Sequence, residues 1–156
     1  MPSLGAQDAL IHLMVAMAAA DGGISDTELR GVGALLATAP VFAGFDLQRL
    51  PDVADRCREI LASEDGLADL IAEIAGSVPV KLHETAYALA VEIAASDTRA
   101  GQPELRLLQM LRDDLDLDPL ATAAIERSAR VRYRKLCPPR TGCRGSISAS
   151  VPRSAS

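Results

Sequence analysis

Residues 18–36 read AAADGGISDTELRGVGALL, and much of this pattern returns 76 positions later as AASDTRAGQPELRLLQML at residues 94–111. Over the 28 positions from 9 to 36, nine residues are identical to their counterparts in the later copy. These nine are Leu13, Val15, Ala18, Ala19, Asp21, Glu28, Leu29, Arg30 and Leu35. Self-similarity at a fixed separation is typical of a repeated structural unit. The sequence therefore predicts an internal duplication.

Each copy has the pattern of a helical hairpin. In the first copy an apolar helix is expected over residues 4–20 and a second helix over residues 26–37. Ser25 and Glu28 match the S-x-x-E capping box that opens a helix, and Pro40 marks the stop of the second one. The hairpin is therefore bounded by recognisable start and stop signals.

The second copy carries equivalent signals. Pro79 is expected to open a helix that runs to about Ser96, and Gly101 with Pro103 opens the next helix. Glu104 again takes the third helical position, as Glu28 does in the first copy. Both copies thus predict the same hairpin.

Three further segments show helical periodicity: residues 46–61, residues 64–77 and a helix that begins at Asp118 and Pro119. Together with the hairpins they predict an all-α fold, a compact bundle of about seven helices with an internal two-fold repeat, over residues 1–131. Residues 132–156 are rich in Arg, Pro, Gly and Ser without periodicity, which predicts a basic, disordered tail.

Charge and composition exclude several classes of function. Residues 1–131 contain 10 basic and 21 acidic side chains, a net charge of −11, whereas the tail has six basic side chains and no acidic one. An acidic body repels phosphate backbones, so we do not expect a nucleic-acid partner. No apolar run is long enough for a membrane span, and no catalytic motif stands out. We expect a cytoplasmic protein that is not an enzyme.

The element shared by both copies is Asp-x6-Glu, which spans Asp21 to Glu28 and Asp97 to Glu104. In each copy the Asp is expected to end one helix and the Glu to lie in the first turn of the next, so both carboxylates meet at one loop. Asp26 can add another oxygen. Hard cations such as Ca²⁺ take oxygen ligands from carboxylates, carbonyls and water. The pattern therefore makes these five residues candidate ligands of a divalent cation.

An Asp at a helix C-terminus opposes the negative end of the helix dipole, and its occurrence in both copies favours a compensating ligand. The alternative is purely structural, since Asp-Gly pairs form ordinary turns and a Glu at the third helical position caps its helix. The spacing leaves both interpretations open. A protein-interaction module with an acidic surface and no bound metal is therefore the alternative function.

The two quoted stretches resemble the TerB family of tellurite-resistance proteins, in which one helix ends in Ala-Asp-Gly and the next begins with an acidic residue two before a Glu. The resemblance covers about residues 4–131. It implies an all-helical fold, metal held at Asp21, Asp26, Glu28, Asp97 and Glu104, and a place beside a TerC-like membrane protein in bacterial stress response. Such a protein would be cytoplasmic and could be peripheral at the inner membrane.

The second copy departs from the family pattern at two positions. Thr98 follows its Asp where the first copy has Gly22, and Gln102 stands where the first copy has Asp26. The second loop has thus lost one acidic position. The metal interpretation consequently depends more on the first loop than on the second.

Overall fold

The computed structural model describes residues 4–96 and 101–136, and the regular elements within these ranges are all helical. In chain order they are α1 (Ala6–Ala18), α2 (Asp26–Thr38), the 3₁₀ turns η1 (Pro40–Phe42) and η2 (Leu47–Arg49), α3 (Leu50–Leu61), α4 (Gly66–Ser77), the 3₁₀ turn η3 (Val80–Leu82), α5 (His83–Ser96), α6 (Gln102–Asp114) and α7 (Pro119–Arg132). This part of the chain has seven α-helices, which confirms the all-α bundle.

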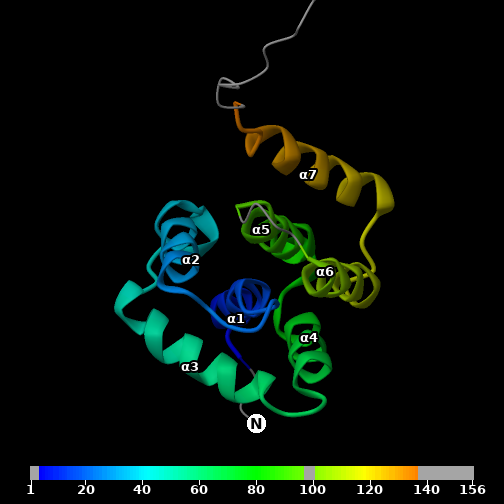
Figure 1. Cartoon of the computed structure of the whole chain (residues 1–156). Coiled ribbons are helices and arrows are strands. Elements are labelled where there is room, and N and C mark those ends of the chain that lie inside the picture. The colour runs from blue at the N-terminus through cyan, green and yellow to red at the C-terminus, as the bar shows by residue number, and fades with distance from the viewer. Residues whose placement is uncertain (1–3, 97–100, 137–156) are drawn as a thin grey trace, which may run out of the picture.

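Helix α1 lies at the centre of the bundle, with α2, α3, α4 and α5 around it (Figure 1). Each of its residues from 9 to 18 is buried. A helix that is apolar on all sides must be enclosed by others, and the sequence of α1 has that character. Helix α5 is the second central helix, because it packs against α1 and also against α6 and α7. The first helix of each repeat therefore forms the core.

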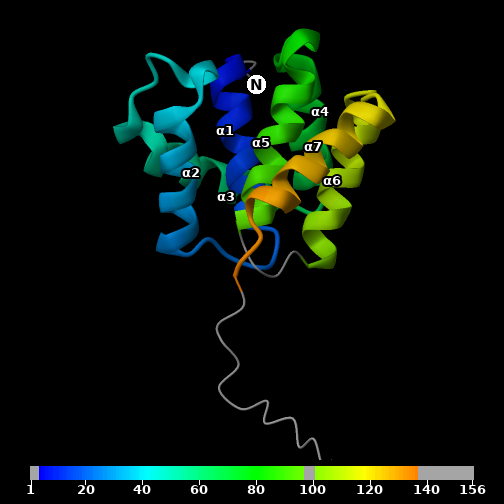
Figure 2. The ribbon, with the colours of Figure 1, turned by 90° about the horizontal axis from the view of Figure 1, so that it is seen from above.

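The duplication is visible in the helix boundaries. Helices α2 and α6 each have 13 residues, and their first residues, Asp26 and Gln102, are separated by the 76 positions of the sequence repeat. Helices α1 and α5 finish, and α2 and α6 begin, at the same end of the molecule (Figure 2). The two loops that carry the candidate ligands thus start from one side of the bundle.

Some boundaries differ from the sequence expectation for local reasons. Helix α1 ends at Ala18, short of residue 20, because the following Asp-Gly-Gly run disfavours helix and Gly22 adopts a positive φ of 117°. The segment from residue 46 begins as a 3₁₀ turn before α3 starts at Leu50, and Pro79 is the N-cap of η3 rather than the start of α5. These changes shift helix ends without altering the fold.

Helix α7 runs to Arg132, one residue past the expected domain boundary. Most of the predicted tail, residues 137–156, lies outside the described residues, as does the segment 97–100. The prediction of a disordered tail therefore stays a prediction.

Candidate metal centre

Glu28 is held at the start of α2 by a reciprocal cap. The backbone N–H of Ser25 donates to Glu28 Oε2 at 2.6 Å, and the N–H of Glu28 donates to Ser25 Oγ at 3.2 Å. This is the capping box that the sequence predicts. It fixes the carboxylate at the N-terminal end of α2, where the helix dipole favours negative charge.

Glu104 occupies the same position in α6 but is more deeply enclosed. One of its carboxylate oxygens, Oε2, accepts a hydrogen bond from the backbone N–H of Gly101. Gly101 has no side chain to return the bond, so only half of the cap exists in the second copy. With 4% of its surface exposed, Glu104 is a buried acidic residue. Charged side chains are rarely buried to this extent without a compensating partner.

The two glutamates line one small cavity. Its volume is about 20 Å³, and its other lining residues are Met17, Ala18, Ile93, Ala94 and Ser96. This is close to the space that a single water molecule needs, and hence to that of one ion. The fold thus brings Glu28 of the first repeat and Glu104 of the second to the same cavity.

Ser96 is a lining residue that the sequence did not indicate. It is the last residue of α5, and its hydroxyl donates to the carbonyl of Ile93 at 2.7 Å. A hydroxyl that donates one hydrogen bond keeps its oxygen lone pairs as acceptors. Ser96 is therefore a residue of the cavity with an oxygen that can act as a ligand, besides the two glutamates. Its counterpart in the first copy is Ala20, so the repeat gave no signal for it.

The first-copy aspartates lie elsewhere. Asp21 is exposed and lies three residues beyond Ala18, the last residue of α1, so it follows the helix end rather than forming it. Asp26 is also exposed and lines a separate surface hollow with Leu29 and Leu47. Neither aspartate lines the cavity that contains Glu28. The cavity instead joins Glu28 to Glu104 of the second copy.

Asp97 falls in the segment 97–100, outside the described residues. In sequence it directly follows Ser96, which lines the cavity. Within residues 4–96 and 101–136, no three side chains of the His, Cys, Asp and Glu types are grouped so that they could hold a metal ion. The described part of the centre is a pair of carboxylates rather than a complete coordination shell.

The chemistry of this pair suits a hard cation. Glu28 and Glu104 both line this small cavity, and a cation bound between two carboxylates is attracted by both of them. Carboxylate and hydroxyl oxygens with water are acceptable ligands for Ca²⁺ or Mg²⁺. The donor set therefore fits a divalent ion, provided that carbonyls, water or further loop residues complete the shell.

A comparison with protein-family models gives one match, to the tellurite resistance protein TerB, over residues 7–127. The chain belongs to the TerB family. The matched range begins in α1 and ends in α7, so it includes both hairpins of this TerB domain. No curated protein and no solved structure matches the chain. In the described residues, none of the helices of this TerB protein has the length and apolar character needed to cross a membrane.

Proposed function

We propose that this TerB protein is a non-enzymatic, cytoplasmic metal-binding adaptor of a bacterial tellurite-resistance or stress-response system, and that it holds one divalent cation between its two hairpins. The observation that carries the proposal is that Glu28 and Glu104, one from each repeat, line a single ion-sized cavity. A cation there links the two halves of the duplication. One ion per chain is the expected stoichiometry.

The proposed ligand set combines described and sequence-based positions. Glu28 and Glu104 would supply two carboxylates, and Ser96, which also lines the cavity, would supply a hydroxyl oxygen. Asp97 is proposed as a further ligand because it follows Ser96 in the chain. Asp21 on the first loop and Asp26 at the start of α2 are exposed, and their charge raises the local concentration of cations. Ca²⁺ or a similar hard cation suits this all-oxygen set.

The adaptor role follows from where the ion would act. Helices α2 and α6 begin at the same end of the bundle, so an ion that joins Glu28 and Glu104 changes the charge and the rigidity of that end (Figure 2). A partner that contacts this end then distinguishes the loaded from the unloaded protein. A TerC-like membrane protein is the proposed partner, which would place the chain at the cytoplasmic side of the inner membrane as a peripheral protein.

A second candidate function is a metal-independent interaction module with an acidic surface. The observation in its favour is that both glutamates already act as helix caps, since each accepts a hydrogen bond from a backbone N–H. If capping is their whole role, the cavity holds only water. In that case partner binding is unaffected by chelation.

Calorimetric titration of the full chain with Ca²⁺, Mg²⁺, Mn²⁺ and Zn²⁺ separates the two functions. We expect saturable binding of at least one ion, and its loss when Asp21→Asn is combined with Glu28→Gln. The matched control is Asp52→Asn with Glu59→Gln, which makes the same charge change on exposed positions of α3. Absence of binding, or binding that survives the first pair of substitutions, would reject the metal function. A metal-dependent rise in melting temperature would count against the rival.

A further inference from the structure

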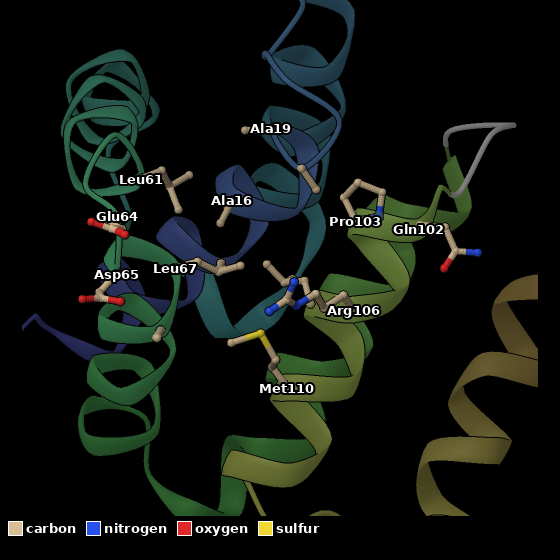
Figure 3. A pocket seen from close by; sticks show the side chains of 13 residues that line it. Ala16, Ala19, Leu61, Glu64, Asp65, Leu67, Gln102, Pro103, Arg106 and Met110 are labelled. Atoms are coloured by element: carbon tan, nitrogen blue, oxygen red, sulfur yellow. The ribbon is translucent and has the colours of Figure 1, made fainter.

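A groove apart from the metal centre lies between the end of α1, the turn from α3 to α4, and α6 (Figure 3). Its volume is about 760 Å³, within the range of small-molecule sites in proteins. Its apolar wall includes Ala16, Leu61, Leu67, Leu107 and Met110. None of its lining residues lines the cavity of Glu28 and Glu104. The groove is therefore a separate candidate site.

One cation points into this groove. The guanidinium of Arg106, on α6, extends toward α1 and α4 over the apolar wall (Figure 3). The ion pairs between described residues do not include Arg106. Glu64 and Asp65 stand at the opposite edge, on the turn before α4. The groove thus offers a guanidinium at one edge, an apolar surface in the middle and negative charge at the other edge.

The internal repeat shows why Arg106 is available. Its counterpart in the first copy, Arg30, is folded back on its own helix: Nε donates to the carbonyl of Asp26 at 3.1 Å and Nη2 donates to Thr27 Oγ1 at 3.4 Å. In the second copy Pro103 takes the place of Thr27 and has no hydroxyl. The replacement removes a local partner of the guanidinium, which instead reaches into the groove.

We propose that this groove binds an organic monoanion, a single carboxylate head on an apolar body. The head pairs with Arg106, because guanidinium and carboxylate form strong charge-assisted hydrogen bonds. The body covers the apolar wall beside Leu67 and Met110. A second negative charge at the far end would approach Glu64 and Asp65, and like charges brought together cost binding energy. The site therefore selects monoanions over dianions of the same length.

Decanoate, decanol and decanedioate are probes that share a chain length and differ in charge. The full chain with ¹³C-labelled methionine methyl groups reports the location of binding, because Met110 lines the groove whereas Met14 is fully buried in the core. Below the micellar range we expect decanoate to shift the Met110 signal saturably and to leave Met14 unchanged. We expect decanol and decanedioate to bind at least about tenfold more weakly, as the loss of one charge-assisted contact implies.

Variants test the role of each part of the groove. Arg106→Gln should weaken decanoate binding at least about tenfold, and the matched control Arg30→Gln should leave it within about twofold. Ala68→Trp fills the groove without changing charge and should also prevent binding. The proposal fails if Met110 does not respond, if decanol or decanedioate binds as tightly as decanoate, or if Arg106→Gln or Ala68→Trp binds like the unmodified chain. None of these variants alters the metal centre, so this failure is distinct from a failure of the metal function.

Discussion

Glu28 and Glu104 show how one position of a repeat can serve two purposes. Each accepts a backbone hydrogen bond at a helix start, yet each also lines the shared cavity. Capping needs only a hydrogen-bond acceptor, whereas a cation needs negative charge. Substitution by Gln keeps the acceptor and removes the charge. At the scale of single residues the two roles can therefore be separated.

Glu104→Gln should leave the free energy of unfolding in EDTA within about 0.5 kcal/mol of the unmodified chain, because the amide oxygen can still accept from Gly101. Glu104→Ala should lose about 1 kcal/mol, since the backbone N–H of Gly101 is left without that acceptor. Both substitutions should abolish the rise in melting temperature that a bound cation produces. Urea unfolding and thermal melts, each with and without Ca²⁺, measure these effects. A Gln variant that keeps the cation effect would contradict the proposed role of the charge.

Cys57 is fully buried against α1, with its thiol directed to the carbonyl of His12 at 3.5 Å. Burial raises the pKa of this thiol from 9.0 to about 12, an effect that the charge of Arg58 only partly opposes. In the unfolded chain the thiol ionises near its ordinary value, so the folded state holds a proton that the unfolded state releases. The resulting stability is present below pH 9 and is lost as the pH rises toward 12.

We expect the unfolding equilibrium of the unmodified chain to shift toward unfolding between pH 9 and 12 more steeply than that of Cys57→Ala. The difference should approach one proton, a tenfold change per pH unit. Both chains should carry Cys137→Ser and Cys143→Ser so that only one thiol differs. Burial also raises the pKa of Tyr87 and of Tyr133, but these residues are common to both chains. Equal pH slopes would show that Cys57 ionises normally in the folded state.

At the scale of elements, the turn from α3 to α4 at the edge of the groove packs closely against the backbone of α3. Gly66 is the first residue of α4, and a Cβ placed on it would lie 1.9 Å from the carbonyl oxygen of Ile60. No side chain fits there unless the backbone moves. The turn also carries Glu64 and Asp65 at the edge of the groove. Its shape therefore affects both stability and the proposed anion site.

Gly66→Ala should destabilise the fold by about 2–4 kcal/mol, in the range of substitutions that force a backbone shift. Gly76→Ala in the same helix is the matched control, because a Cβ there meets nothing within 4 Å. The control should be neutral or stabilising by up to about 1 kcal/mol, since Ala favours helix over Gly. Denaturant unfolding of the three proteins makes the comparison. Equal stabilities would mean that the turn relaxes freely.

The N-cap residues of α2 and α6 differ by the side chain of a serine: Ser25 caps α2, and Gly101 stands at the same position before α6. Ser25 caps α2 through its hydroxyl, whereas Gly101 leaves the equivalent cap of α6 half-formed. Gly101 has an extended backbone with φ of −90°, which any residue adopts without strain. Gly101→Ser should restore the full box and stabilise the fold by a few tenths of a kcal/mol. A lower melting temperature of the Gly101→Ser variant would show that the start of α6 cannot adopt the capping-box geometry found at the start of α2.

At the scale of the whole molecule, the repeat explains why so much of the fold could be predicted from sequence. Caps, prolines and apolar periodicity are local signals, and they predicted both bounds of α2 and the start of α6 to within about a residue. The bounds predicted for α1 and the start predicted for α3 were less accurate. Gly22 and Pro51 lie near these helix ends, and their effect on a helix end depends on the conformation of the neighbouring turn.

The site could be predicted only in part. The sequence selects Glu28 and Glu104 as equivalent, but whether they face one point depends on how the two hairpins pack through α1 and α5. The same tertiary arrangement leaves Asp21 and Asp26 at the surface. It also creates the groove of Arg106, for which the exchange of Thr27 by Pro103 between the repeats is the one sequence signal. The spacing of residues within one repeat does not determine how far they lie from residues of the other repeat.

The stoichiometry of cation binding tests the shared site most directly. Titration of the EDTA-treated full chain with Mn²⁺, followed by the loss of the free-ion paramagnetic resonance signal, counts bound ions per chain. We expect one tightly bound ion, and we expect Glu28→Gln alone and Glu104→Gln alone each to abolish it, because each repeat supplies one carboxylate to the same cavity. Two independent ions per chain, or an ion that survives either substitution, would contradict a single centre shared by the two hairpins.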